Sequence, residues 1–175
     1  MPNNYVLLER IELNTAASSV VFDNIPQTGY TDLKIVVSAR TTQTGSSAAG
    51  DISIRFNNNS SAVYTYRGIT GNGSSATSFA ISNDTLFTYM AFADGNDATA
   101  STFGNTEIYI PSYLASLNKP FSTFSTQENN ATTAYLGETA GLWSNTAAIT
   151  SITFDANGDS FVAGSSFYIY GIKNS

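Results

Sequence analysis

The segment SSFYIYGIKNS, residues 165–175, carries the pattern that decides the fold predicted by this sequence. Alternate residues of an extended strand point to opposite faces of its sheet. Here both faces are apolar or aromatic, with Phe167, Ile169 and Gly171 on one and Tyr168, Tyr170 and Ile172 on the other. A strand of this kind is typical of a sheet interior covered on both sides. We therefore expect the C-terminal strand to be a central one.

The preceding segment, AAITSITFDANGD, supplies a second strand close to the first. Thr150, Ile152 and Phe154 alternate and form its expected inward row. Residues 155–159 are Asp, Ala, Asn, Gly and Asp, a composition that favours a turn. The two strands are therefore expected to pair as the final hairpin of the chain.

Period-two alternation recurs along the chain in short segments separated by turn residues, and no sustained helical period is present. A single helical turn is expected at residues 113–117. Residues 5–13 could form a strand or one short helix, and the alternation of Ile11 and Leu13 with Glu12 favours the strand. The other expected strands before the final hairpin are residues 19–22, 30–40, 51–56, 63–67, 86–92, 106–110, 121–128 and 135–143. About ten short strands of this kind predict an all-β fold. We expect an antiparallel β-sandwich of jelly-roll-like topology, with residues 1–175 forming a single domain.

The composition predicts a polar surface with few charges. Charged residues make up 11% of the chain, whereas Ser, Thr and Asn together fill about a third of its positions. Such a surface suits packing against other subunits better than ionic steering. The formal net charge of −6 and the seven scattered Lys and Arg residues argue against nucleic acid as a partner, because phosphate repels an acidic chain.

The chain contains neither cysteine nor histidine. Thiol nucleophiles, Ser-His-Asp catalysis and His-ligated metal sites are therefore excluded, and no cofactor is expected. The N-terminal sequence lacks the pattern of a signal peptide, and no apolar run is long enough to span a bilayer. We expect a soluble chain that is made in a cytoplasm and does not contact membranes.

Three carboxylates are the remaining candidates for hydrolysis: Glu107, Glu128 and Glu138. The alternative is that they are outward-facing strand residues that keep the surface soluble. Lys34 and Lys119 are expected on an outward strand position and in a polar turn, where neither amine is desolvated. The acidic residues are likewise expected at exposed positions. No catalysis is therefore expected.

Two further patterns could bind ligands. Asp155, Asn157 and Asp159 alternate as oxygen ligands for Ca²⁺ often do, although such residues are also common in turns for conformational reasons. The aromatic residues Trp143, Tyr109 and Tyr113 could offer flat faces to a sugar ring, or could equally be core residues or subunit contacts. The glycine-rich segment at residues 71–75 lacks the Lys-Ser or Lys-Thr of a phosphate-binding loop and is expected to be a turn.

Long stretches of the sequence resemble virion proteins of tailed bacteriophages. The segment from FGNTEIYIPSYL to TSITF (residues 103–154) and the closing SSFYIYGIK carry the resemblance. YTDLKIVVSAR, DISIRFNNNSSAVYTYRG and GNGSS precede them in the same order. The most specific pieces are GLWSNTAAITSITF and YGIK, and neither contains a catalytic motif.

This resemblance implies a virion component of small β-sandwich type, assembled in the host cytoplasm. The first expectation is a capsid decoration (cement) protein that binds the outside of the head and stabilises neighbouring subunits of the major capsid protein. The alternative is a tail- or head-fibre module that recognises host surface glycans. Because capsids offer local three-fold axes, a homotrimer is expected.

Overall fold

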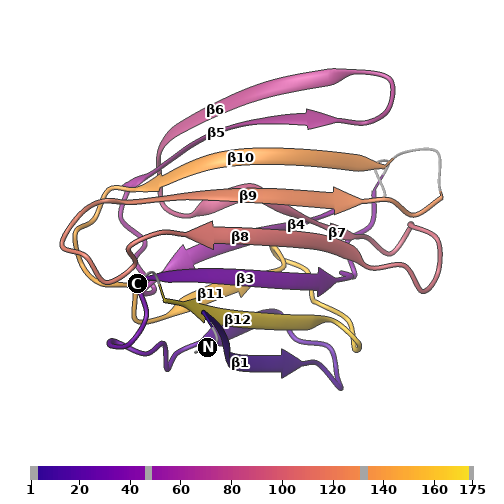
Figure 1. The fold of residues 1–175 in the computed structure, drawn as a ribbon. Helices are drawn as coiled ribbons and strands as arrows, with labels where there is room; N and C mark the ends of the chain where they lie inside the picture. Colours follow the sequence, from indigo (N-terminus) through magenta and orange to yellow (C-terminus); the bar gives the residue numbers. More distant parts are fainter. Residues whose placement is uncertain (1–3, 46–48, 131–133, 174–175) are drawn as a thin grey trace.

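Two antiparallel β-sheets face each other across a continuous hydrophobic core in the computed structural model, which describes residues 4–45, 49–130 and 134–173 (Figure 1). The strand order is β1-β12-β3-β8-β9-β10-β5-β6 in the eight-stranded sheet and β2-β11-β4-β7 in the four-stranded sheet. The bounds are β1 Tyr5–Glu12, β2 Ser19–Phe22, β3 Asp32–Ala39, β4 Ala49–Phe56, β5 Tyr64–Gly71, β6 Ala76–Asp84, β7 Phe87–Asp94, β8 Gly104–Ile110, β9 Lys119–Gln127, β10 Tyr135–Trp143, β11 Ile152–Asp155 and β12 Ser166–Ile172. The predicted all-β sandwich is confirmed.

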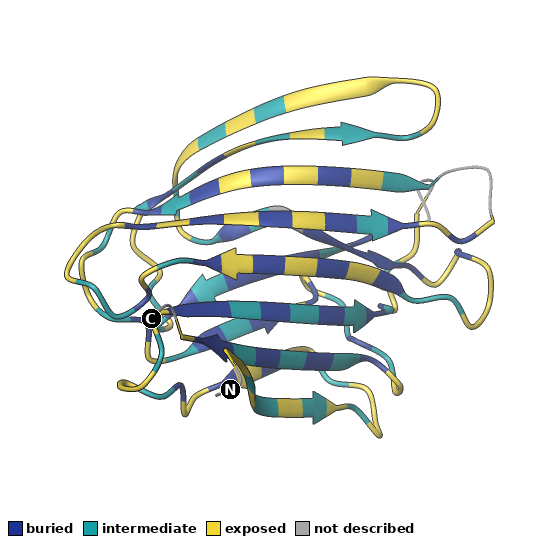
Figure 2. Cartoon of the chain, in the orientation of Figure 1, coloured by how far each residue is buried: buried dark blue, intermediate teal, exposed yellow. Residues whose placement is uncertain are grey.

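Alternating side chains of both sheets meet in the core, which Figure 2 shows as alternating dark and light bands along the strands. At one end of the core, aromatic rings pack edge to face. The ring centroids of Phe87 and Phe121 lie 4.3 Å apart, and those of Phe56 and Trp143 lie 5.7 Å apart. Toward the other end, Phe161 packs on Phe167 at 5.1 Å. These edge-to-face contacts add to the stability that comes from removing the rings from water.

The C-terminal strand lies inside its sheet, as predicted, but the expected cover on both of its faces is wrong, because the four-stranded sheet covers only one. β12 pairs with β1 on one side and with β3 on the other. Phe167 and Ile169 are buried in the core, while Tyr168 and Tyr170 are half-buried on the outer face. At Gly171 a Cβ atom would lie 2.5 Å from the ring of Tyr30, so the close approach of this ring requires glycine.

The predicted final hairpin is wrong. β11 pairs with β2 and β4 in the four-stranded sheet, whereas β12 belongs to the eight-stranded sheet. The connection between them carries Phe161, whose backbone forms bridges with Ala17 and Thr41 and whose side chain is buried. Because this ring is buried between the sheets, the chain crosses from the four-stranded to the eight-stranded sheet instead of turning back as a hairpin. The turn at residues 155–159 does form, with positive φ at Asn157 and Gly158.

Two other local predictions are also wrong. The expected helical turn at residues 113–117 is a set of hydrogen-bonded turns, and no helix is present among the described residues. The edge strand β6, ATSFAISND, was missed because none of its residues is fully buried, so hydrophobic alternation is weak. Within the described ranges, no helix could cross a membrane.

Candidate interaction surfaces

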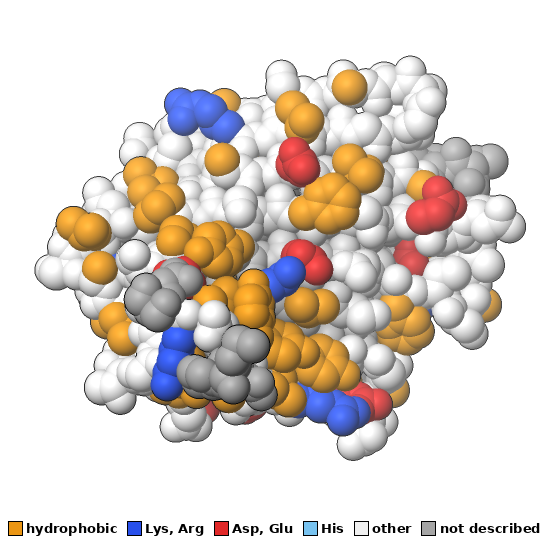
Figure 3. Space-filling model, viewed as in Figure 1, with side chains coloured by type: hydrophobic (Ala, Val, Ile, Leu, Met, Phe, Trp, Pro, Cys, Tyr) orange, Lys and Arg blue, Asp and Glu red, His pale blue; other side chains and the backbone are white. Residues whose placement is uncertain are grey.

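The outer face of the eight-stranded sheet carries most of the large apolar side chains that remain exposed. This face is turned toward the viewer in Figure 3, where apolar patches spread across the sheet between a few charges. The exposed apolar residues on it are Tyr5, Leu7, Ile69, Tyr109, Phe124 and Leu136. Exposed apolar side chains gathered on one face are typical of an interaction surface.

A hollow of about 680 Å³ lies in this face, over strands β8, β9, β10 and β5. The strand register defines how its lining side chains are arranged. Phe124 on β9 lies directly between Glu107 on β8 and Glu138 on β10. In the next row the small residues Ser122 and Ala140 lie between Tyr109 on β8 and Arg67 on β5. The depression therefore arises because small side chains are flanked by large ones.

Two polar contacts fix the β8 side of the hollow. Lys34 Nζ lies 2.8 Å from Glu107 Oε2. The Tyr109 hydroxyl donates a hydrogen bond of 2.6 Å to Asp32, which also accepts one from the Ser112 N–H. The bond to the Asp32 carboxylate, together with burial, raises the pKa of Tyr109 to about 12. The phenol therefore stays protonated at physiological pH, and its ring is held in one orientation.

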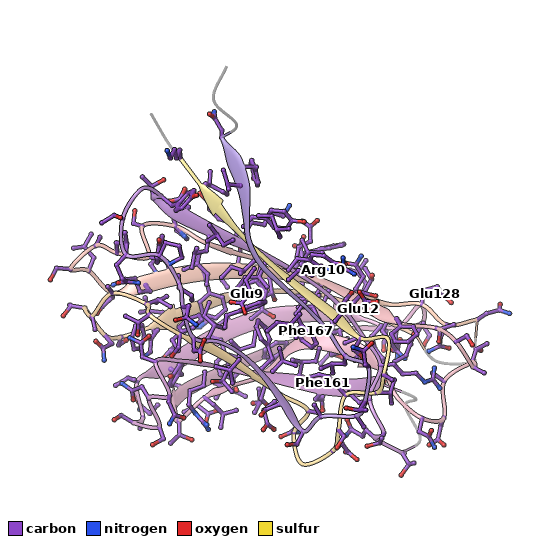
Figure 4. All side chains as sticks on the ribbon, turned by 90° about the horizontal axis from the view of Figure 1, so that it is seen from below. Glu9, Arg10, Glu12, Glu128, Phe161 and Phe167 are labelled. Atoms are coloured by element: carbon purple, nitrogen blue, oxygen red, sulfur yellow. The ribbon has the colours of Figure 1, made fainter. Side chains whose placement is uncertain are left out.

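Of the three predicted carboxylates, the structure brings two together. Glu107 and Glu138 lie on the same face, two strands and therefore about 10 Å apart in the backbone. Glu128 follows the end of β9, where its side chain accepts the backbone N–H of Asn130, and Figure 4 shows it at a projecting end of the molecule. Only the pairing register, which the sequence did not reveal, decides this grouping.

Two of the three predicted interaction aromatics are buried. Trp143 ends β10 on the inner row, where its ring packs on Phe56, and Tyr113 donates its hydroxyl proton to the carbonyl of Pro26. Tyr109 is the one that remains accessible, with 39% of its surface exposed. Sequence reasoning missed Phe124. The spacing of Phe121 and Phe124 places them on opposite faces of one strand, which was an available signal.

The expected exposure of Lys119 and of all acidic residues is also wrong. Lys119 is buried, and its ammonium group donates to the carbonyls of Ala115, Leu117 and Thr146. Burial lowers the pKa of Lys119. Asp32 and Asp94 are buried as well. Lys119 and Asp32 begin strands β9 and β3, and Asp94 ends β7. Residues distant in the sequence cover these strand ends, so local sequence did not reveal their burial.

Two of the predicted calcium candidates accept hydrogen bonds from other groups of the protein. Asp155 accepts the N–H of Asn157 at 2.8 Å, and Asp159 accepts the hydroxyl proton of Thr42 at 3.3 Å. The first contact is one expected of a turn residue, whereas the second joins the turn to a distant part of the chain. Among the described residues, no group of three or more Asp and Glu side chains is placed to hold a metal ion.

The edge strand β6 is a second candidate surface. Among the described strands it pairs only with β5, so its other side presents unpaired backbone N–H and C=O groups. From Ala76 to Asn83 it contains no charged residue and no proline. Natural sheets usually protect such an edge with charges, proline or bulges. The register of β6 with β5 shifts only at its Asp84 end, between the partners Tyr64 and Tyr66. The stretch from Ala76 to Ile81 has none of these protections and is therefore a template on which another strand could pair.

Comparisons with known proteins identify no family. No family model and no curated protein matches the sequence. Among solved structures, the chain is similar to Scytalido-glutamic peptidase at 10% identity, covering 95% of this chain and 66% of the peptidase, with a TM-score of 0.27. It is also similar to a fructofuranosidase from Schwanniomyces occidentalis at 10% identity, covering 99% of this chain and 35% of the enzyme, with a TM-score of 0.29.

Proposed function

We propose that this chain is a structural protein of a tailed-bacteriophage virion, specifically a decoration protein on the outside of the head. It binds the major capsid protein, stabilises neighbouring subunits and assembles as a homotrimer in the host cytoplasm. The resemblance of its sequence to virion proteins supports this proposal. The low share of charged residues, 11%, supports it too, since few charges have to be removed from water when subunits pack against each other.

The stretch of the β6 edge from Ala76 to Ile81, which has no charge, proline or bulge, is the observation that carries the proposal. A strand supplied by a neighbouring virion protein would satisfy its free backbone groups, and such strand addition combines many hydrogen bonds without any need for charged contacts. A protein that worked as a free monomer would gain nothing from this edge and would risk aggregation.

Copy number on the virion tests the proposal. In purified virions, quantitative mass spectrometry is expected to find hundreds of copies, as decoration of a whole head requires, and about a dozen or fewer if the chain belongs to a fibre. Adding purified protein to heads that lack it is expected to raise their temperature of disruption. A copy number near a dozen would contradict decoration and support a fibre module that recognises host glycans. The hollow beside Phe124 favours that second candidate.

We also propose that the chain catalyses nothing. The ammonium group of Lys119 is held by three carbonyls, and Glu107 is occupied by an ion pair with Lys34. Incubation with host polysaccharide, peptidoglycan and lipid A is expected to release no reducing ends, peptides or acyl chains. Turnover that disappears in Glu107→Gln or Glu138→Gln would contradict this.

A further inference from the structure

The hollow over β8, β9, β10 and β5 combines apolar rings with polar groups that have no partner in the fold. We propose that it binds a neutral saccharide, which packs on Phe124 and Tyr109 and hydrogen-bonds with Glu138 and Arg67. This site goes beyond a decoration role and does not depend on it.

The size and shape of the hollow suit a small chain of sugar rings. Its volume of about 680 Å³ falls in the range of small-molecule sites, about 300–1,000 Å³. From β8 to β5 it crosses three inter-strand spacings, or about 14 Å. Ser122 and Ala140 keep its middle low, so a ligand can lie across the strands.

The apolar part of the site is already in place. Phe124 has 42% of its surface exposed although it carries no polar atom that water could solvate. The C–H face of a pyranose ring is flat and apolar, and packing it on an aromatic ring removes both from water. The hydrogen bond from Tyr109 to Asp32 fixes the second ring, so little conformational freedom is lost on binding.

The polar part supplies both an acceptor and a donor. Glu138 on β10 and Arg67 on β5 lie on adjacent strands, where Glu138 is opposite Ile69 and Arg67 is opposite Ala140. Among the described residues, neither the Glu138 carboxylate nor the Arg67 guanidinium makes a hydrogen bond or ion pair. A sugar hydroxyl both donates and accepts, so it can use a carboxylate and a guanidinium at once. Such bonds determine which hydroxyl configuration is recognised.

The charges around the hollow favour a neutral ligand. Glu107 and Glu138 balance Lys34 and Arg67, and Lys34 is already paired with Glu107. The protein as a whole carries a net charge of −6, which repels sialylated, sulfated or phosphorylated glycans. A neutral saccharide needs no unpaired charge in the hollow and is not repelled by the net charge of the protein.

Binding to an immobilised glycan panel tests the proposal. The panel contains neutral oligosaccharides of glucose, galactose, mannose and N-acetylglucosamine, with sialylated and sulfated glycans beside them. The full chain is expected to bind at least one neutral member and none of the anionic ones. Calorimetric titration of that member is expected to show about a tenfold weaker affinity for Phe124→Ala, because the stacking surface is lost.

Matched variants separate the hollow from the rest of the apolar face. Leu136→Ala removes a similarly exposed side chain, 48% against 42%, from the same face outside the hollow and is expected to bind normally. Glu138→Gln is expected to bind more weakly while unfolding at the same temperature. Absence of binding to every neutral glycan, binding of anionic glycans alone, or equal losses in Phe124→Ala and Leu136→Ala would overturn the proposal. None of these results changes the copy number that tests decoration.

Discussion

The two edges of the eight-stranded sheet differ in how they are protected. β1 contains Glu9, Arg10 and Glu12 among its eight residues, has a bulge between Leu7 and Glu9, and forms an ion pair between Arg10 and Glu12 (Figure 4). At the opposite edge, β6 has nine residues and carries only the terminal Asp84 as a charge. Its own register irregularity lies at that same end, opposite Tyr64 and Tyr66, so the stretch from Ala76 to Ile81 pairs without a bulge. The difference indicates that β1 is closed to further strand pairing, while β6 is open to it.

The largest effect is expected from removing the strand that joins the β1 edge to the sheet. Deleting residues 167–175 removes most of β12, which leaves β1 without a partner and exposes the buried side of β3. Soluble folding should therefore be lost, because β1 has no partner left and β3 keeps only β8 beside it, over an apolar face. Thermal unfolding followed by circular dichroism measures this, and a truncated chain that still unfolds cooperatively would contradict the central role of β12.

A second, smaller effect is expected at the open edge. Ser78→Lys with Ala80→Lys places two charges on β6 at exposed positions. The affinity of the protein for phage heads should weaken about tenfold or more, while the free energy of unfolding changes by less than about 0.5 kcal/mol. Leu7→Lys at the protected β1 edge is the matched control and should bind normally in the same co-sedimentation assay. Equal losses from both edges would show that the edges do not differ in function.

Between the two edges, the hydrogen bond from Tyr109 to Asp32 can be tested by measuring stability as a function of pH. The pKa of Tyr109 is raised to about 12 in the fold, so the stability contributed by its bond to Asp32 is present below pH 10 and is lost as pH rises through about 12. Tyr109→Phe should make the free energy of unfolding fall less steeply over this range. The buried Tyr64, whose pKa is also raised to about 12, should preserve part of the slope. Identical slopes in Tyr109→Phe and the unmodified chain would show that the bond does not contribute.

The smallest effect is expected at the protected edge. Arg10→Thr with Glu12→Thr removes an exposed ion pair, which contributes little to stability. The temperature of unfolding should stay the same, while self-association should increase because only one charge, Glu9, remains on the edge. Sedimentation velocity over a range of concentrations measures the change. If association is unchanged, the bulge and Glu9, rather than the ion pair, protect β1.

Local pattern predicted strands well wherever one face is buried. Residues 135–143 were predicted to be a strand and coincide with β10, whose burial alternates along its length. β6 lacks this alternation because neither of its faces is fully covered, so it was missed. Prediction of the site was poorer. Tyr109 and two of the three glutamates were identified, but Phe124 and Arg67, which complete the hollow, were not.

The sequence by itself determined the β class, the inward rows of most strands and the central character of β12. These features follow from the period of two in a strand, which is local and independent of partners. Only the tertiary structure decided that β11 pairs with β2 and β4, that Trp143 and Lys119 are buried, and that Glu107 and Glu138 flank Phe124. Each of these depends on which distant strands become neighbours and in which register. Because that choice is settled by how all the apolar faces pack together, no single segment encodes it.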